Sequence, residues 1–486
     1  MSNSAVRRID LVTKKRLHVV GVGGPGMSAV ALALAGMGHE VSGSDIRESP
    51  ILDHLRRSGV TVTIGHDASL IDHCDAVTSS PAIPADNCEV VAARSRSIFL
   101  TRAEMLASIC AVRPTIGVAG THGKTTTSAL LVRVLQECGL RPSFIVGGEL
   151  IDEETSARWS DGPWTIVEAD ESDGTHLYLP LAATILTNID VDHLDHFADF
   201  EAIVDSFCLY VLGVQGVSVV CLDDAGCQRL LEDPRLAGHT GVITYGSNEQ
   251  AQVRYSDVTV TKGHTHFTVH VPFNSGIDTS PDGSFDQKFE VETSLRGLHN
   301  VANITAVIAL AAALGVPLPE AVAAVGSFSG VGRRFEIIGR DNGITFVDDY
   351  AHLPREIEAV LEAARSSDEG WKRIVAVFQP NRFNRMAVLA PAYANCFASA
   401  DVVVITDIYA SGTKKIDGVT GQLVIDAISE ANPNTDVRWA ARRDTLAEFV
   451  APILEAGDLC ISMGCGDIET LPLEILDIFR EAHGVD

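Results

Sequence analysis

The chain lacks the sequence patterns that mark membrane and secreted proteins. No run of about 18 apolar residues is free of charged or turn-forming residues, and the segment from Met1 to Lys15 is polar and basic without an apolar core. We therefore expect no membrane-spanning helix, no secretory signal peptide and a cytoplasmic location.

Paired cysteines and positive charge are also scarce. The ten cysteines are scattered without a Cys-x-x-Cys pair, which favours reduced thiols over disulfides and argues against a zinc site. The 37 lysines and arginines face 64 acidic residues, and the net charge of −27 opposes contact with nucleic acid or an anionic membrane. Any anionic substrate must therefore be held by local basic groups.

What the chain does have is length and an α/β pattern. Its 486 residues are too many for a single hydrophobic core, and a typical domain size of about 150 residues predicts three domains. Short apolar strands alternate with helical segments throughout, and no repeat is visible. We place the domains at 1–111, 112–332 and 333–486. A β-rich excursion at 248–291, with an exposed polar loop at 272–287, is interpreted as an insertion in the second domain.

The most informative segment, 115–127, is a short strand, a glycine turn and a Lys-Thr pair that opens a helix. Glycines let successive amides face an anion, and the helix N-terminus adds partial positive charge. Lys124 would reach the outer phosphates and Thr125 would ligate Mg²⁺. Val118 stands where a strict Walker A pattern has glycine, and an ordinary strand-to-helix turn is the alternative. The expected nucleotide-phosphate contacts are Gly120, Thr121, His122, Gly123, Lys124, Thr125 and Thr126.

A second glycine turn, Gly21 to Gly26, follows the first strand, and Asp45 ends the next one. This Gly-x-Gly-x-x-Gly spacing is typical of a Rossmann-like site for a nucleotide or dinucleotide diphosphate. The pattern does not choose among such ligands. A tight turn needed only for packing is the alternative.

Four carboxylates lie within 168–173, directly after an apolar strand. Such crowding is costly unless cations neutralise it, and Mg²⁺ bound through one or two carboxylates would do so. A solvated acidic loop is the alternative. His193 and His196 follow another strand among acids and are candidate metal or phosphate ligands, although His196 could instead begin a helix.

In the third block, polar groups again follow apolar strands, at 348–352 and 379–385. Arg382 and Arg385 could clamp a carboxylate or phosphate, or they could be surface residues at a strand edge. Arg333 and Arg334 lie where the second and third blocks join.

In this order, the motifs resemble the Mur ligase family over nearly the whole chain. The resemblance rests on 21–28 with 41–45, 117–127, 168–174, 187–188 with 192–196, 297–300, 333–336, 348–350, 407–409 and 464–467. The Glu-Ser-Asp-Gly at 171–174 is similar to the branch of the family that adds L-alanine to UDP-N-acetylmuramate in peptidoglycan synthesis.

The resemblance implies a three-domain α/β architecture: a Rossmann-like N-terminal domain that holds the UDP-sugar, a central P-loop ATPase-like domain, and a Rossmann-like C-terminal domain for the amino acid. It implies an acyl-phosphate mechanism with ATP and Mg²⁺, in a monomer or homodimer. The implied UDP-substrate contacts are Gly23, Gly24, Met27, Ser28, Ser44, Asp45, Ser79, Ser80, Ser172 and Asp173.

Further roles are implied by the same resemblance. ATP would also contact Asn300, Asn303, Arg334 and Asp349, and Mg²⁺ would be held by Thr125, Glu168 and His193. The amino acid would bind Tyr350, His352, Arg382 and Arg385, and the catalytic residues would be Lys124, Arg334 and His352.

The chain departs from the family pattern near the implied amino-acid site. Leu353 and Asn381 stand where histidines are usual, and Cys465 stands where a small residue is usual. Leucine cannot hydrogen-bond, and asparagine cannot titrate near neutral pH. A related ligase that uses another small amino acid, such as glycine or serine, is therefore an alternative.

Two other classes of protein fit part of the pattern. A nicotinamide-dependent oxidoreductase would use the first glycine turn but leave Lys124 and Thr125 without a role. A P-loop switch that hydrolyses ATP slowly would use the second turn alone.

Overall fold

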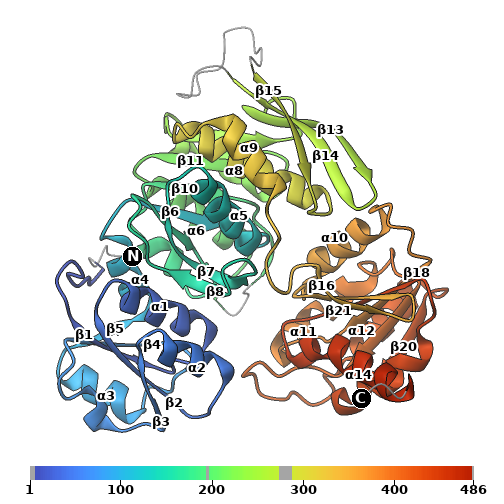
Figure 1. The fold of residues 1–486 in the computed structure, drawn as a ribbon, viewed down its shortest axis with the longest axis horizontal. Helices are drawn as coiled ribbons and strands as arrows, with labels where there is room; N and C mark the ends of the chain where they lie inside the picture. Colours follow the sequence, from blue (N-terminus) through green and yellow to red (C-terminus); the bar gives the residue numbers. More distant parts are fainter. Residues whose placement is uncertain (1–5, 193–195, 273–286, 484–486) are drawn as a thin grey trace. The chain divides into compact units, whose positions relative to one another are not determined.

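The computed structural model describes residues 6–192, 196–272 and 287–483. The chain forms two compact units, and Figure 1 labels their helices and strands. Unit 1 comprises residues 1–257, 267–292 and 302–329, and unit 2 comprises residues 258–266, 293–301 and 330–486.

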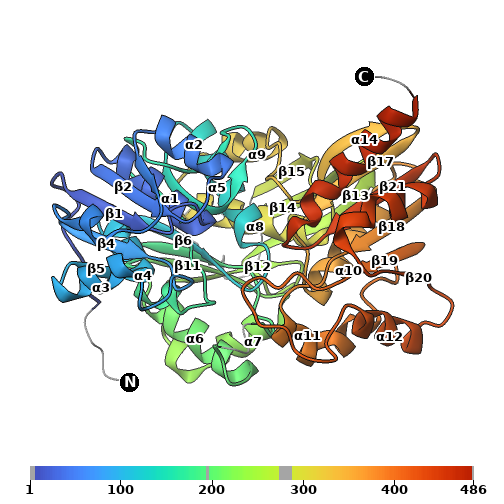
Figure 2. The ribbon, with the colours of Figure 1, turned by 90° about the horizontal axis from the view of Figure 1, so that it is seen from below.

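Unit 1 begins with a five-stranded parallel sheet in the order β3-β2-β1-β4-β5. The strands are β1 (Arg16–Val20), β2 (Glu40–Asp45), β3 (Thr61–Ile64), β4 (Ala76–Ser79) and β5 (Phe99–Thr101). Helices α1 (Pro25–Gly36) and α2 (Pro50–Arg57) lie on one side of the sheet, and α3 (Cys88–Ser95) and α4 (Arg102–Cys110) lie on the other (Figure 2). The strand order reverses between β1 and β4, where α/β sheets hold their ligands.

Local sequence explains where the helices of this sheet begin. Gly24 is the N-cap of α1 and Pro25 follows it, which suits proline because the first helical N–H needs no intrahelical acceptor. Thr101 and Glu104 form a capping box at the start of α4, each side chain accepting from the other residue's backbone N–H. Arg102 is thereby fixed in the first turn of α4.

A second sheet, most of which belongs to unit 1, has ten strands in the order β15-β14-β13-β12-β11-β10-β6-β9-β7-β8. They are β6 (Thr115–Ala119), β7 (Ser143–Leu150), β8 (Thr155–Arg158), β9 (Thr165–Glu168), β10 (Ala183–Leu186), β11 (Val217–Cys221), β12 (Val242–Gly246), β13 (Val253–Thr261), β14 (His264–Val271) and β15 (Gln287–Thr293). Strand β6 is buried throughout and pairs in parallel with β10 and β9. The segment that follows β6 therefore leaves the middle of the sheet.

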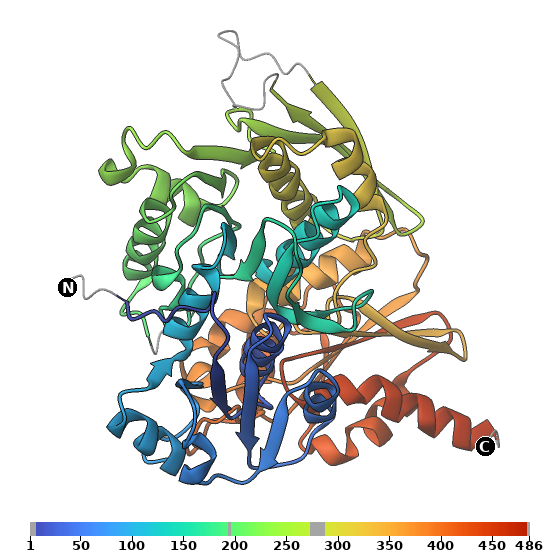
Figure 3. The ribbon, with the colours of Figure 1, turned by 60° about the vertical axis from the view of Figure 1, so that its left-hand side comes forward.

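Five helices accompany this sheet: α5 (Lys124–Glu137), α6 (Phe200–Leu212), α7 (Ala225–Leu231), α8 (Leu298–Ala313) and α9 (Leu318–Gly326). Helices α5 and α9 lie side by side (Figures 1 and 3). The Arg133 side chain of α5 donates to the Ser327 hydroxyl at 3.4 Å, just after α9 ends.

Unit 2 is built on a six-stranded sheet in the order β16-β17-β21-β18-β19-β20, in which only β16 is antiparallel. The strands are β16 (Glu336–Asp341), β17 (Ile344–Asp349), β18 (Arg373–Phe378), β19 (Val402–Thr406), β20 (Asp436–Ala440) and β21 (Asp458–Met463). The helices are α10 (Pro354–Arg365), α11 (Phe383–Leu389), α12 (Gln422–Ala431), α13 (Leu446–Val450) and α14 (Leu471–His483).

Both faces of the unit 2 sheet are buried, as expected for parallel strands covered by helices. Along β18, Ile374, Ala376 and Phe378 enter one core cluster, whereas Val375 and Val377 enter another. This alternation is the two-residue period of a strand. The carboxyl ends of these strands therefore lie on a rigid scaffold.

The predicted α/β architecture is confirmed. The predicted alternation of short apolar strands and helical segments is observed in the described residues. The β-rich excursion contains β13 to β15, and most of its loop lies outside the described residues. The alternative in which His196 begins a helix is wrong, because α6 begins at Phe200 and is capped by Asp199. The division into three domains stays a prediction.

No helix in the described part of the chain combines the length and apolarity needed to cross a membrane. All ten cysteines are free thiols.

Candidate active site

The segment after β6 is a tight turn that requires glycine at two positions. Gly120 has a φ of 127°, and a Cβ there would lie 2.2 Å from the Thr187 hydroxyl oxygen. Gly123 has a φ of 78°, and a Cβ there would lie 3.0 Å from the Asn303 amide oxygen. Residues that carry a side chain rarely adopt such backbone angles. The turn leads directly into the N-terminus of α5, the arrangement that suits an anion.

Residues that follow β10 hydrogen-bond to this turn. The Asn188 side chain accepts from the His122 backbone N–H at 2.8 Å and donates to the His122 carbonyl at 3.0 Å. The Thr187 hydroxyl donates to the same carbonyl at 2.6 Å, and the His122 ring lies 3.1 Å from the Asp190 carboxylate. The loop conformation is therefore set by the strand next to it.

Lys124, the first residue of α5, is directed at the turn and at the acidic segment. Its Nζ donates to the Gly120 carbonyl at 2.6 Å and lies 3.0 Å from Oε2 of Glu171. Burial opposes the charge on Lys124, but the nearby carboxylates of Glu171, Asp170 and Glu168 outweigh burial and raise its pKa. Lys124 is thus a fixed positive charge beside the phosphate turn.

Thr125 and Glu168 bring two oxygen ligands together. The Thr125 hydroxyl donates to the Glu168 carboxylate at 2.9 Å, and the same carboxylate oxygen accepts from the Gly147 N–H at 2.8 Å. A hydroxyl and a carboxylate are hard donors of the kind that Mg²⁺ prefers, so the pair fits this ion. His193 lies outside the described residues. Within 6–192, 196–272 and 287–483, no three His, Cys, Asp or Glu side chains gather as a metal site.

The rest of the acidic segment is held by an arginine and by local turns. Asp170 accepts from the Ser172 N–H at 3.0 Å and its hydroxyl at 2.9 Å, and Asp173 accepts from the Thr175 N–H at 3.0 Å. Arg102 forms ion pairs with Asp173 at 3.0 Å and Asp170 at 3.4 Å. Burial alone would raise the pKa of Asp170, but Lys124, these hydrogen bonds and Arg102 lower it to about 2. The segment is therefore held in a defined conformation, and the lowered pKa keeps Asp170 ionised at neutral pH.

The glycine turn of the first sheet is anchored on the end of β2. The N–H groups of Gly21 and Val22 donate to the Ser44 carbonyl at 2.8 and 3.0 Å, and the Gly23 N–H donates to the Asp45 carboxylate at 2.8 Å. Two of the other predicted UDP contacts, Met27 and Ser28, are buried in α1, and their N–H groups donate to the Gly24 carbonyl. Ser79 is the last residue of β4, and Ser80 follows it. The structure therefore brings Ser44 and Asp45 to the turn.

The sequence analysis did not identify Glu89, a buried carboxylate that hydrogen-bonds to Ser44. Glu89, on α3, is fully buried and accepts from the Ser44 hydroxyl at 2.7 Å and the Asp67 N–H at 3.0 Å. The rings of His18 and His66 each lie 3.1 Å from its oxygens. Burial would raise the pKa of Glu89, but hydrogen bonds from His18 and Ser44 lower it overall. Its position on α3 follows no recognisable motif, so no sequence signal marked it.

In unit 2, Asp349 ends β17 as a buried acceptor. Its carboxylate accepts from the N–H groups of Phe335 and Ala351, both at 2.7 Å. Burial raises the pKa of Asp349 to about 6, although Arg334 and these hydrogen bonds act in the opposite direction. The Arg334 guanidinium lies over the Tyr350 ring at 5.2 Å from its centroid. Asp349, Arg334 and Tyr350 therefore form one cluster.

His352 and the start of α10 lie next to this cluster. The His352 Nδ1 lies 3.1 Å from the Tyr350 carbonyl and 3.2 Å from the Glu356 carboxylate. Glu356 also accepts from the Leu353 N–H at 3.1 Å, and Leu353 itself is buried. Leu353 is thus a buried apolar residue at the start of α10.

The segment after β18 carries the two candidate arginines. The Arg385 side chain donates to the Asn381 amide oxygen at 2.8 Å. Arg382 has a φ of 61°, unusual for a residue with a side chain, and its buried Nε finds no hydrogen-bond partner among the described residues. Burial raises the pKa of the Cys465 thiol although Arg385, Arg333 and Arg382 lower it.

The predicted residues divide between the units. Unit 1 contains those of the two glycine turns, the acidic segment and Asn303, and unit 2 contains Asn300, Arg334, Asp349, Tyr350, His352, Arg382 and Arg385. Asn300 donates to the Arg296 carbonyl at 2.8 Å.

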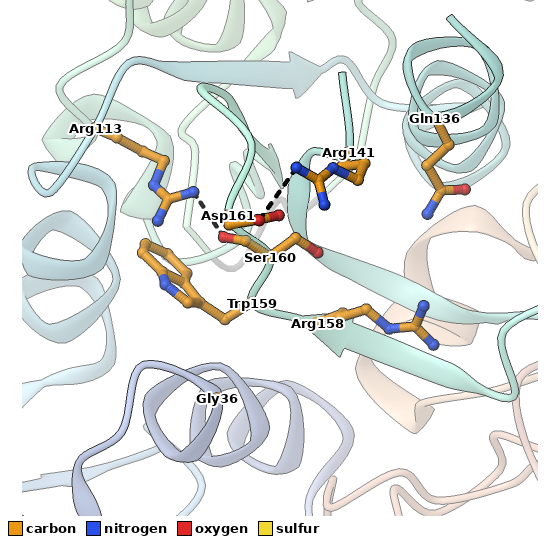
Figure 4. A pocket seen from close by; sticks show the side chains of 8 residues that line it. All are labelled: Gly36, Arg113, Gln136, Arg141, Arg158, Trp159, Ser160 and Asp161. Carbon is orange, nitrogen blue, oxygen red and sulfur yellow. Dashed lines mark hydrogen bonds and ion pairs between the residues drawn. The ribbon is translucent and has the colours of Figure 1, made fainter. Parts of the chain in front are cut away.

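A separate cleft of about 620 Å³ lies in unit 1 at the edge formed by β8 and the end of α1 (Figure 4). The Arg113 guanidinium stacks on the Trp159 ring at 4.0 Å, and a Cβ at Gly36 would lie 2.9 Å from the Trp159 Cβ. Arg141 pairs with Asp161 at 3.1 Å, both largely exposed. Trp159 therefore packs the end of α1 against the second sheet.

Comparisons with known proteins identify the family of this chain. Three family models match: the Mur ligase family catalytic domain over residues 16–113, the Mur ligase middle domain over 118–311, and the Mur ligase glutamate ligase domain over 333–466. A crystal structure of UDP-N-acetylmuramate-alanine ligase MurC from Thermotoga maritima is similar with a TM-score of 0.78 at 27% identity, covering 96% of this chain and 100% of that chain.

Two curated proteins named UDP-N-acetylmuramate–L-alanine ligase are similar over nearly their whole length. The one from Agrobacterium fabrum is 39% identical over 472 residues, and the one from Sinorhizobium fredii is 40% identical over 473 residues; each alignment covers 95% of this chain and 97% of the relative. Since the three models together span most of the chain and these relatives match almost all of it, the chain belongs to the Mur ligase family, as its motifs predicted.

Proposed function

We propose that this protein joins L-alanine to UDP-N-acetylmuramate with conversion of ATP to ADP and phosphate, a step of peptidoglycan synthesis. The observation that carries the proposal is the similarity, over 95% of the chain, to proteins named for this reaction. The contacts of Lys124, Thr125 and Glu168 support the nucleotide part of it.

In unit 1, the turn from Gly120 to Gly123 and the N-terminus of α5 hold the ATP phosphates, with Thr126 following in the helix. Lys124 supplies a full positive charge at the γ-phosphate, where charge develops as the phosphoryl group transfers. When nucleotide binds, the Lys124 ammonium exchanges part of its contact with Glu171 for phosphate oxygens. Asn303, next to Gly123, lies near the adenine.

Mg²⁺ would be held by Thr125 and Glu168, with His193 as a further ligand. It would neutralise the phosphate oxygens and so make the γ-phosphorus easier to attack.

In unit 2, Arg334 carries positive charge to the phosphates and Asp349 accepts from the ribose, with Asn300 near the adenine. Tyr350, Arg382 and Arg385 hold the amino acid, whose carboxylate suits an arginine fork. The His352 Nδ1 lies beside the Tyr350 carbonyl and the Glu356 carboxylate, which favours a proton on Nδ1.

The reaction has two steps. A carboxylate oxygen of the sugar attacks the γ-phosphorus, the bond to the β,γ-bridging oxygen breaks, and ADP leaves with that electron pair. The amine nitrogen of L-alanine then attacks the acyl carbon, a tetrahedral intermediate forms and phosphate leaves with the electron pair of its carbon–oxygen bond. The amine proton passes to a base, for which His352 is the candidate.

The UDP-sugar occupies the glycine turn of the first sheet, with Gly23, Gly24, Met27, Ser28, Ser44, Asp45, Ser79, Ser80, Ser172 and Asp173 around it. We place this function in a domain of residues 1–111, ATP in 112–332 and the amino acid in 333–486. A monomer or a homodimer would serve equally, since each role is filled from one chain.

Phosphate release by the purified protein tests the proposal. Release should require ATP, UDP-N-acetylmuramate and an amino acid together, and L-alanine should give the highest kcat/KM. Glycine and L-serine test the alternative of another small amino acid. Hydrolysis that ignores the amino acid would favour a P-loop switch, and binding of NADH seen by fluorescence would favour an oxidoreductase.

A further inference from the structure

One arginine outside the sequence motifs lies between the two segments assigned to the UDP-sugar. Arg102 is the first residue of α4. Its Nη2 donates to the Asp173 carboxylate at 3.0 Å and to the Asp170 carboxylate at 3.4 Å. On the other side, a Cβ at Gly26 would lie 3.2 Å from Nη1. A single guanidinium therefore connects the acidic segment with the glycine turn of the first sheet.

The glycine turn has no cation of its own. Residues 21–28 contain no lysine, arginine or histidine, and the Asp45 carboxylate beside the turn already accepts from the Gly23 N–H. Backbone amides and the N-terminus of α1 supply only partial positive charge. A diphosphate entering a chain with a net charge of −27 needs a full positive charge close by, and Arg102 is the guanidinium that approaches Gly26.

The surroundings of Arg102 fix its position before any ligand arrives. Its side chain is 21% exposed, and its buried Nε has no hydrogen-bond partner within the described ranges. Burial opposes the charge, but Asp173 and Asp170 raise the pKa of Arg102 overall. A guanidinium oriented in advance loses little rotamer entropy when it binds an anion.

We propose that Arg102 binds the diphosphate of the UDP-sugar through the side of its guanidinium that faces Gly26, while Nη2 remains on the acidic segment. This inference rests on the proposed function for the identity of the ligand and goes beyond it by naming the cation that selects a diphosphate. The same side chain links occupancy of the sugar site to the segment that carries Glu168 and Glu171.

Calorimetric titration of the full-length protein with UDP and with uridine separates a charge contact from a structural role. Arg102→Gln should weaken UDP binding at least tenfold and change uridine binding less than twofold. Arg102→Lys should restore part of the loss, because it keeps the charge without the fork. Arg96→Gln is the matched control, since Arg96 follows α3 and pairs with Asp72 at 2.8 Å, and it should bind UDP like the wild type.

Equal weakening of UDP and uridine by Arg102→Gln would show that Arg102 only supports the fold, and unchanged UDP binding would show that it does not touch the diphosphate; either result overturns the inference. If Arg102→Gln does not fold by circular dichroism, Arg102→Lys decides by the same comparison. Phosphate release is measured in parallel on the wild type. A wild type that binds UDP but releases no phosphate would contradict the proposed reaction and leave the role of Arg102 intact.

Discussion

The Lys124 ammonium lies 3.0 Å from the Glu171 carboxylate, and the Glu171 side chain is only 2% exposed. A buried carboxylate needs such a partner, because an unpaired buried charge is costly. The pair holds Lys124 beside the phosphate turn, so the positive charge is in place before nucleotide binds.

Lys124→Ala should therefore remove most of the activity. Loss of one preorganised charge at a transferring phosphoryl group costs about 10²-fold to 10³-fold in kcat, and the variant should also be less stable because its buried ion pair with Glu171 is lost. Steady-state phosphate release measures the first effect and thermal melting the second. Lys288→Ala removes an exposed lysine of β15 and should behave like the wild type. A Lys124→Ala kcat within threefold of the wild type would rule out the assigned role.

Glu89→Gln should weaken binding of the UDP-sugar. Ser44, whose hydroxyl donates to Glu89 at 2.7 Å, carries the carbonyl that accepts from Gly21 and Val22. An amide has one acceptor fewer than a carboxylate, so part of this network must rearrange. We expect the KM for UDP-N-acetylmuramate to rise several-fold, with the KM for ATP unchanged.

The control for Glu89 is another buried carboxylate with ion-pair partners. Asp458, at the start of β21, is 1% exposed and pairs with Arg373 at 2.7 Å. Asp458→Asn should lower the melting temperature without raising the KM for UDP-N-acetylmuramate. If both variants melt early and neither alters that KM, Glu89 is important for stability alone.

His176 should make unit 1 sensitive to acid. Its ring is buried beside Phe207 and Tyr210, with Nε2 3.0 Å from the Ser206 hydroxyl. Burial lowers the pKa of His176 from 6.5 to about 4, so the folded state favours the neutral ring. The stability that this contributes is complete above pH 6.5 and is lost as the pH falls toward 4.

Denaturant titrations at pH 7.5 and pH 4.5 measure this effect. The wild type should lose about 2 kcal/mol more than His176→Gln over this interval, on the scale of 1.4 kcal/mol per pKa unit. His73→Gln, at an exposed position, should lose as much as the wild type. Equal losses in the wild type and His176→Gln would exclude His176 as the titrating group.

The fold was largely predictable because its strands are short apolar runs separated by glycine turns. Parallel strands buried on both faces leave a strong signal, as in β6, where all five residues are buried. The sequence also predicted a glycine turn followed by a helix opened by Lys124 and Thr125, and both are observed; their role in phosphate binding stays a prediction.

Arg102 and Glu89 were not predictable from local patterns. Arg102 contacts Asp170 and Asp173, which lie about 70 residues away in the sequence. Glu89 contacts His18, which lies 71 residues away in the sequence. Such contacts depend on how helices pack on a sheet, which no short motif encodes. Of the two interpretations left open for His196, the helix start is excluded because the Asp199 cap places the start of α6 at Phe200.

Leu353→His should change amino-acid selection. Leu353 is buried next to His352 at the start of α10, and an imidazole there would add a hydrogen-bonding group beside the proposed amino-acid site. We expect the ratio of kcat/KM values for L-alanine, glycine and L-serine to shift by at least threefold. Val388→His, at an exposed position, is the control. An unchanged ratio would place the amino acid away from Leu353.

The most direct test of the whole account is phosphate release by the wild-type protein under four conditions: ATP alone, ATP with UDP-N-acetylmuramate, ATP with L-alanine, and all three together. We predict sustained release only with all three, with one ligated sugar nucleotide formed per phosphate. Release at the same rate without L-alanine or without the sugar nucleotide would contradict it.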